Sequence, residues 1–341
     1  MTTDNLVSVL VVAWGHEPQL GACLGAVLAS QGVDLEVIIV DNGDRSGQLQ
    51  AFGADPRVRI LKPGRNLGFA AGCNLAASVA AGEVFVLVNP DAVVEPSAAS
   101  ELVSALRDPT VGIATASVRL ADQPQTINSA GNPVHYLGLA WAGEHGTDAT
   151  RNQARREVAS ASGACCAVKA SWWRSLDGFD PAYFAYHEDV EMSLRSWQQG
   201  RSVVYVPTAV AYHHYEFSRN EQKLYLLERN RLVTVLTTYS RRTLMIIAIP
   251  LIALEVAVLA KAAAEGWLPA KARGYIWILR NFGLLHARRR RIQAERTHDD
   301  HDLAGLYAVR FTPGVIAAGP VLNFANRLSE IGGWVFRKWA A

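Results

Sequence analysis

The residues with the clearest chemical potential stand at the end of a short apolar run. Val84–Val88 is followed directly by Asn89, Pro90 and Asp91. Such a run is typical of a strand buried on both faces, and Pro90 must end it because proline cannot donate to a sheet ladder. Asp91 would then lie at the carboxyl edge of a parallel sheet, where a carboxylate can hold a divalent metal on a diphosphate. The alternative is that Asp91 turns the chain or caps the next helix.

Two further stretches bring polar groups to the same predicted edge. Asp41 follows the apolar run Leu35–Val40. An Asp at such an edge commonly hydrogen-bonds a base or ribose, although Asp-Asn-Gly is also a good turn sequence. The loop Arg65–Asn74 contains Gly68 and Gly72 and opens a helical pattern, so free N–H groups at the helix start could receive phosphate. The loop lacks the G-x-G-x-x-G spacing, which argues against a dinucleotide site.

Two adjacent acidic residues, Glu188 and Asp189, stand at the start of another helical pattern. Phe184 and Tyr186 precede it. Partial desolvation beside these rings would raise the pKa of Asp189 toward the range of a general base, and aromatic rings also suit sugar faces. Neighbours at a helix start can both face a cleft, so Glu188 is the alternative base. A third option is ordinary favourable charge at a helix N-terminus.

The elements that must position these residues alternate between strand and helix over roughly the first 120 residues. The predicted strands are Val7–Ala13, Leu35–Val40, Val58–Leu61, Val84–Val88 and Gly112–Val118, with helices over 18–30, 67–81 and 98–107 between them. This order predicts an α/β fold with a Rossmann-like, mixed but mostly parallel sheet flanked by helices. Further on, we expect loops with a hairpin over 121–158, a strand over 160–169 and two short extended pieces over 202–206 and 209–214.

Composition bounds the class of protein. With 341 residues, 50% of them hydrophobic, the chain can form one large or two modest domains. The formal net charge of +2 gives no reason to expect a nucleic-acid partner. The four cysteines lack zinc-ligand spacing, and the chain starts with polar residues rather than a signal peptide, so we expect the reducing cytoplasm.

After Arg242 the sequence becomes strongly apolar, with aromatic and basic residues between the apolar stretches. This change predicts a catalytic domain over 1–240 and a helical C-terminal region over 241–341. The stretch 244–260 is apolar, but Pro250 interrupts it and it carries Glu255, so we expect a helix pair lying in the membrane surface rather than a span. Aromatic residues interleaved with Arg and Lys, and the run Arg288–Arg291, favour an anionic membrane interface. The alternative is a buried helix of a soluble subdomain or a dimer interface.

Taken in order, the motifs VSVLVVAW, VIIVDN, NLGFAAGCN, LVNPD, GFDPAYFAYHEDVEMSLR, AYHH and ERNR resemble those of family 2 glycosyltransferases with the GT-A fold. Within that family the chain is most similar to the bacterial rhamnosyltransferase-like branch. The resemblance covers residues 8–233. It implies an inverting, metal-dependent transfer of a sugar from a nucleotide-sugar donor.

The resemblance also implies roles for single residues. It implies nucleotide contacts for Ala13 and Asp41, and diphosphate or base contacts for Asn66, Gly68, Phe69 and Asn74. The Asp-x-Asp motif corresponds to Asn89 and Asp91, and the implied Mg²⁺ or Mn²⁺ ligands are Asp91 and His213. The implied catalytic base is Asp189, with Glu188 as the alternative. His214 is the alternative ligand, and a packed, structural role for His213 is also open. Two departures stand out: Asn89 replaces the first Asp of the motif, and Trp14-Gly15 replaces the usual Tyr-Asn.

The implied donor is dTDP-L-rhamnose, with a UDP-sugar as the alternative. The implied acceptor is a polyprenyl-linked or cell-envelope glycan at the cytoplasmic face of the membrane, with the protein bound peripherally and a homodimer as an option. A sugar nucleotidyltransferase is the rival, but it should carry a Gly-rich, basic loop where this chain has Trp14-Gly15-His16-Glu17. A non-catalytic scaffold is a third alternative.

Overall fold

The computed structural model describes residues 6–214, 220–312 and 319–339. These residues form two compact units. The first unit comprises Met1–Asn132, Ala142–Ser196 and Arg201–Glu216, and the second comprises Pro133–Trp141, Trp197–Gly200 and Phe217–Ala341. The predicted domain division at residue 240 stays a prediction.

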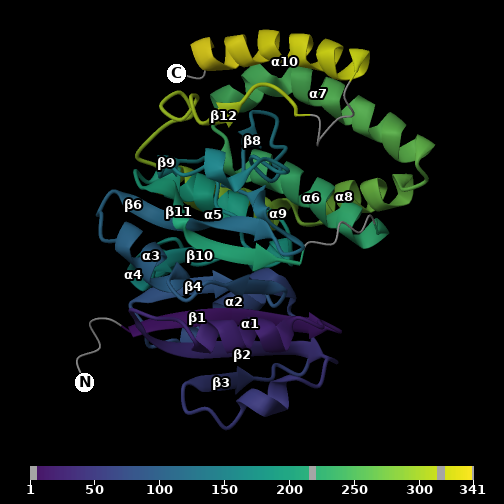
Figure 1. Ribbon diagram of the computed structural model, residues 1–341. Helices are drawn as coiled ribbons and strands as arrows, with labels where there is room; N and C mark the ends of the chain where they lie inside the picture. The colour runs from purple at the N-terminus through teal and green to yellow at the C-terminus, as the bar shows by residue number, and fades with distance from the viewer. Residues whose placement is uncertain (1–5, 215–219, 313–318, 340–341) are drawn as a thin grey trace. The chain divides into compact units, whose positions relative to one another are not determined.

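The first unit is built on one sheet with the strand order β3-β2-β1-β4-β10-β6-β11-β5. These strands are β1 Leu6–Gly15, β2 Asp34–Asp44, β3 Val58–Leu61, β4 Val84–Val88, β5 Ala92–Val94, β6 Val111–Leu120, β10 Cys165–Lys169 and β11 Ser202–His213; β7 Gln123–Ser129 pairs with β6, and β9 Arg156–Glu157 pairs with β11. Figure 1 shows β1, β2, β3 and β4 side by side. The predicted α/β class with a mixed, mostly parallel sheet is confirmed.

Helices follow the strands as the sequence pattern predicts. In the first unit they are α1 Leu20–Leu28, α2 Gly68–Val79, α3 Ala98–Ala105, α4 Ala170–Ser175 and α5 Glu188–Gln198, whose last residues belong to the second unit; short 3₁₀ turns lie at Leu49–Phe52, Ala149–Arg151 and Pro181–Tyr183. The apolar sides of α1 and α3 pack with the strands into one buried core. Every residue of β4 is buried, as expected for a strand covered on both faces.

The sheet turns mixed beyond β4. Strand β10 lies antiparallel between β4 and β6, so the chain enters it from the edge that carries the predicted site. The two predicted extended pieces near residues 202–214 form one strand, β11, whose register to β6 shifts between Val206 and Val210. The prediction of two pieces was wrong because Pro207 lies in this irregular stretch, where an irregularity in the pairing admits a residue that cannot donate.

The second unit is largely helical. It contains α6 Glu221–Thr238, α7 Arg241–Ala264, α8 Leu268–Arg280, α9 Phe282–Glu295 and α10 Pro320–Trp339, and a short pair of parallel strands, β8 Val134–His135 and β12 Tyr307–Ala308. The predicted interruption at Pro250 was wrong, because α7 runs for 24 residues with Pro250 inside it. By length and composition, α7 is able to cross a membrane.

Candidate active site

A carboxylate and an imidazole meet where β4 and β11 end. Asp91 Oδ1 lies 3.1 Å from His213 Nε2, and the side chain of Asp91 is 27% exposed. Backbone pairing holds these two segments together, because β11 pairs with β5 through His213 and Ala92. The His214 N–H also donates to the Asp91 carbonyl. Of the two candidate histidines, His213 is therefore the one whose ring faces Asp91, whereas His214 is exposed.

Asn128, on β7, sets the orientation of the His213 ring. Its Oδ1 lies 3.0 Å from His213 Nδ1, and an amide oxygen only accepts, so Asn128 matches the tautomer that carries its proton on Nδ1. In that tautomer Nε2 presents a lone pair toward the Asp91 carboxylate. Two acceptors that face one another in this way suit a shared cation, and a histidine ligand commonly donates its other N–H to such a partner. Oxygen and nitrogen donors fit Mg²⁺ or Mn²⁺.

The predicted nucleotide edge is formed by β1 and β2. Ala13 is buried and pairs with Asp41 across the two strands. Asp41 Oδ1 accepts from the backbone N–H groups of Gly43 at 3.0 Å and Asp44 at 2.8 Å, so this carboxylate also fixes the backbone at the end of β2. Trp14, at the end of β1, exposes 61% of its surface.

Asn42, a residue that the sequence did not single out, joins this edge to the glycine-rich loop. Its buried side chain donates to the Gly68 carbonyl at 3.0 Å and accepts from the Leu67 N–H at 3.2 Å. Within the loop, Asn66 Oδ1 accepts from the Gly68 N–H at 2.8 Å. The amide groups of Asn42 and Asn66 therefore fix the backbone at the start of α2.

Gly68 is required by the approach of a second segment. It has a φ of +78°, and a Cβ at this position would lie 2.5 Å from the Phe184 carbonyl oxygen. That carbonyl accepts from the Ala70 N–H at 3.1 Å. The glycine-rich loop is thus bonded to the segment that leads into Glu188-Asp189. Phe69 is half-buried, with its ring centroid 6.0 Å from that of Phe179.

The backbone before the acidic pair is in an uncommon conformation. Phe184, Tyr186 and His187 have φ values of 65°, 68° and 68°. Non-glycine residues rarely adopt positive φ, and such strain persists where the surroundings impose it, often at functional sites. The strained segment delivers Glu188 and Asp189 to the first turn of α5.

Asp189 faces a small-residue loop between β9 and β10. Its Oδ2 accepts from the Gly163 N–H at 3.0 Å and its Oδ1 from the Val190 N–H at 2.8 Å. Ala164, next in the loop, accepts from the Asn89 N–H at 3.0 Å, so this loop ties Asp189 to the Asn89-Pro90-Asp91 segment. A Cβ on Gly163 would lie 3.4 Å from Asp189 Oδ2 and 3.7 Å from the Phe69 ring.

The two acidic residues have different environments. Burial and the neighbouring Asp189 raise the pKa of Glu188 well above its ordinary value, and its Oε2 is buried with no hydrogen-bond partner among the residues that the structure describes. Burial also raises the pKa of Asp189, while the Gly163 and Val190 N–H groups counteract it. The backbone donors therefore favour the charged form of Asp189, whereas burial and the neighbouring carboxyl group disfavour the charged form of Glu188.

Tyr186 links the acidic pair with the metal candidate. It is 39% exposed, and burial, Glu188 and Asp91 raise the pKa of its hydroxyl, in that order. The loop at Gly163 and Ala164 bonds both to Asp189 and to Asn89, so Asp91, His213 and the Glu188-Asp189 pair lie around the same end of β4. Their functional roles stay predictions.

Asn74 has a different setting from the predicted donor contact. Its Nδ2 donates to the Phe179 carbonyl at 2.7 Å, and its Oδ1 accepts from the Phe179 N–H at 3.0 Å. Both polar atoms thus hold the turn before the strained segment. A donor contact of Asn74 stays a prediction.

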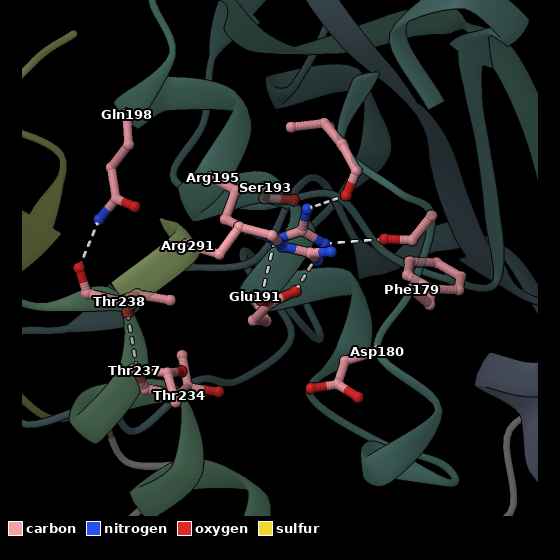
Figure 2. A network of polar contacts seen from close by, with 12 residues as sticks. Phe179, Asp180, Glu191, Ser193, Arg195, Gln198, Thr234, Thr237, Thr238 and Arg291 are labelled. Atoms are coloured by element: carbon pink, nitrogen blue, oxygen red, sulfur yellow. Dashed lines mark hydrogen bonds and ion pairs between the residues drawn. The ribbon is translucent and has the colours of Figure 1, made fainter. Parts of the chain in front are cut away.

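A buried ion pair supports the same turn from α5. Arg195 pairs with Glu191, and its side chain is 1% exposed. Its guanidinium also donates to the carbonyls of Leu176 and, at 2.8 Å, Gly178 (Figure 2). The acidic helix start and the turn at 176–180 are therefore fixed to one another by one side chain, which the sequence pattern alone did not reveal.

Comparisons with known proteins identify the family and the fold of the chain. Residues 4–234 match the family described as "Glycosyltransferase like family 2". An N-acetylglucosaminyl-diphospho-decaprenol L-rhamnosyltransferase of Mycobacterium tuberculosis is 30% identical over 62% of this chain and 76% of its own length. An uncharacterized protein of Sinorhizobium fredii is 29% identical over 65% of this chain, and the match spans 26% of that relative.

Solved structures show the same fold. GalNAc-T7 with UDP, GalNAc and Mn²⁺ aligns with a TM-score of 0.56 at 15% identity over 71% of this chain and 49% of its own. The mannosyltransferase PcManGT from Pyrobaculum calidifontis, in complex with GDP-Man and Mn²⁺, aligns with a TM-score of 0.52 at 16% identity over 98% of this chain and 87% of its own. The predicted GT-A fold is confirmed. The chain belongs to glycosyltransferase family 2.

Proposed function

We propose that the protein is an inverting, metal-dependent glycosyltransferase that moves a sugar from a nucleotide-sugar donor to an acceptor hydroxyl. The observation that carries the proposal is the meeting of the Asp91–His213 pair with the Glu188-Asp189 pair at one sheet edge. A transferase of this type needs a base for the acceptor and positive charge for the leaving diphosphate, and this edge offers a candidate for each.

The donor side of the site is assigned to Asp91, His213 and the start of α2. Asp91 and His213 would hold Mg²⁺ or Mn²⁺, which offsets the charge of the leaving nucleoside diphosphate. Asn128 keeps His213 in the tautomer whose Nε2 can ligate. Asn89, at the first position of the motif, is uncharged and leaves the carboxylate role to Asp91. Asn66, Gly68 and Phe69 line the predicted diphosphate or base contact.

The acceptor side is assigned to Asp189. Its carboxylate takes the proton of the acceptor hydroxyl while that oxygen attacks the anomeric carbon of the donor, and the bond to the diphosphate breaks. A single displacement from the opposite face inverts the anomeric configuration. The N–H groups of Gly163 and Val190 hold Asp189 in position, and the raised pKa of Glu188 favours a neutral neighbour over a second negative charge.

For the substrates, we propose dTDP-L-rhamnose as donor and a polyprenyl-linked glycan as acceptor, with a UDP-sugar as the alternative donor. The support is the M. tuberculosis relative, whose name specifies an L-rhamnosyl transfer to N-acetylglucosaminyl-diphospho-decaprenol. Membership of the glycosyltransferase family favours sugar transfer over the nucleotidyl transfer considered from the sequence. A lipid-linked acceptor accords with a peripheral position at the cytoplasmic face of the membrane; a homodimer stays a prediction.

A donor panel tests the proposal. The full chain is incubated with Mg²⁺ or Mn²⁺, a polyprenyl diphosphate-linked N-acetylglucosamine, and dTDP-rhamnose or one of several UDP-sugars. Mass spectrometry should find the acceptor heavier by one deoxyhexose with dTDP-rhamnose, together with released dTDP. Transfer from a UDP-sugar instead would assign the alternative donor, and transfer that continues unchanged in EDTA would refute the metal role of Asp91.

A further inference from the structure

Helix α7 has one face that the described part of the chain leaves exposed. Four apolar side chains at helical spacing, Met245, Ile249, Ile252 and Val256, are between 61% and 82% exposed. Of the 18 residues in the most apolar stretch of α7, 11% are buried within the structure. An exposed apolar stripe of this length is a surface for a partner or a membrane rather than for water.

A second face of α7, about a quarter-turn from this stripe, carries a charge that is fixed by two other helices. Glu255 pairs with Arg231 of α6 and, at 2.8 Å, with Lys271 of α8, and it accepts from the Tyr275 hydroxyl. Glu228 of α6 completes the cluster, at 2.8 Å from Arg231 and 2.6 Å from Lys271.

This cluster is ionised and enclosed. The side chains of Arg231 and Lys271 are each 1% exposed. Burial alone would raise the pKa of Glu228, but the charges of Arg231 and Lys271 outweigh it and lower this pKa to about 2. Removing one member would leave an uncompensated buried charge, so the cluster locks the rotation of α7 about its axis.

The locked rotation decides between two membrane arrangements. Glu255 lies roughly 21 Å along α7 from Arg241, at about 1.5 Å per residue. In a spanning helix this depth is within the hydrocarbon core of about 30 Å, which would also have to accept Arg231, Lys271 and the polar helices that carry them. A helix lying parallel to the surface buries its stripe in lipid and keeps the cluster on the protein side.

Helix α10 extends the same kind of surface. Its residues Phe324, Leu328, Ile331 and Trp334 are between 55% and 65% exposed. A Cβ on its Gly332 would lie 3.7 Å from Pro250 Cβ, so α10 packs on α7 along the helix (Figure 1).

Basic residues border both stripes. Arg241 and Arg242 are exposed at the start of α7, and Arg327, Arg337 and Lys338 are exposed on α10. Lys338 lies over the Trp334 ring, 4.9 Å from its centroid. Apolar side chains with a basic border complement an anionic bilayer. A second copy of this chain would bring basic groups against basic groups.

We propose that α7 and α10 form a lipid-facing surface that lies in the plane of one leaflet of an anionic membrane, with the Glu228–Arg231–Glu255–Lys271 cluster holding the apolar face of α7 outward. The inference deepens the peripheral location within the proposed function and rests on that part of it. Its tests measure membrane topology and binding without any sugar transfer.

The four native cysteines are buried, so introduced thiols can report topology in the full chain. Arg242→Cys and Ala263→Cys place single exposed thiols near the two ends of α7. In bacterial membrane vesicles, an impermeant maleimide should label both variants in inside-out vesicles and neither in right-side-out vesicles. Labelling of the two ends from opposite sides, or absence of the protein from the membrane fraction, would overturn the proposal.

Binding supplies an independent test. Ile249→Glu and Ile252→Glu should each weaken flotation with phosphatidylglycerol-containing liposomes by about tenfold, because a charge enters the lipid-facing stripe. Ala51→Glu adds the same charge at an exposed site of the first unit and should bind like wild type. Unchanged flotation in both stripe variants, or a change in oligomeric state in its place, would contradict a lipid-facing surface.

Discussion

At the residue scale, the site separates the roles of two adjacent acids. Burial and the neighbouring Asp189 raise the pKa of Glu188 well above its ordinary value, whereas Asp189 keeps backbone donors on both oxygens. Adjacent residues with nearly the same chemistry thus have unlike proton affinities. A base adjacent to a neutral acid, rather than a second anion, loses its proton more readily.

The pH dependence of the reaction should report Asp189. Burial raises its pKa above the ordinary value of about 3.9. Because the carboxylate form is active, kcat/KM should be constant at high pH and fall as the pH drops through this raised pKa. The measurement is kcat/KM against pH with saturating metal. An acid limb centred at or below about pH 4 would contradict the desolvated setting of Asp189.

Asn128 should control metal affinity through the His213 ring. Asn128→Ala removes the acceptor of the Nδ1 proton, and loss of such a partner weakens metal binding by roughly 10- to 100-fold. Mn²⁺ titration followed by electron paramagnetic resonance measures this without turnover. Gln125→Ala, an exposed change on the same strand, is the control. Equal Mn²⁺ affinity in Asn128→Ala and wild type would remove Asn128 from the site.

Sequence reasoning found the residues that carry charge and missed those that hold them. Asp91, Asp189 and His213 stand in recognisable motifs, so the sequence singled them out, and their roles stay predictions. Asn128 lies in the stretch 121–158, where no periodicity marks a register, and Gly163 lies in a loop just before β10, where the sequence predicted a strand over 160–169. Their roles depend on strand pairing across distant positions, which a single sequence does not encode locally.

At the element scale, α2 and the turn before the strained segment behave as one element. Asn74 bonds both the N–H and the carbonyl of Phe179, and the Phe184 carbonyl accepts from Ala70. Movement of the glycine-rich loop is therefore coupled to the segment that leads to Asp189, the proposed base. The family resemblance implies a donor contact for this loop, and the structure shows that the loop is also bonded to the segment proposed to serve the acceptor.

Asn74→Ala should therefore cost stability and turnover together. Two partly buried hydrogen bonds are lost, which should lower the free energy of unfolding by about 1–3 kcal/mol. Urea denaturation gives this value, and steady-state kinetics should show a lower kcat from a misplaced Asp189. Ser78→Ala, on the exposed part of α2, serves as the control. A higher donor KM with unchanged stability would support instead the direct donor contact predicted from the sequence.

Helix limits show where local signals fail. Pro250 removes a helical hydrogen bond at a cost of about 3 kcal/mol in a helix interior, which made an interruption the natural expectation. The structure keeps α7 continuous, with Ile247 fully buried on one face and Glu255 fixed by Arg231 and Lys271 on the same helix. Packing and ion pairing between helices outweigh the local penalty, and neither is visible in the residues around Pro250.

At the scale of the whole molecule, the chain combines a family 2 glycosyltransferase sheet with a helical unit that carries exposed apolar stripes. Helix α7 begins at Arg241, and the domain division predicted at residue 240 stays a prediction. The second unit also includes α6 and the short segment 133–141, which lie within the stretch 1–240 that was predicted to be one domain. Long-range contacts, rather than local composition, define its extent.

The most direct measurement compares Asp189→Asn with wild type in sugar transfer and in donor binding under the same conditions. The substitution preserves shape and removes the charge that accepts the proton. The account predicts that donor and Mn²⁺ bind with wild-type affinity while kcat falls by about 10²–10⁴-fold, the usual contribution of a general base. Near-normal transfer by Asp189→Asn with donor bound would contradict the assignment of Asp189 as the base.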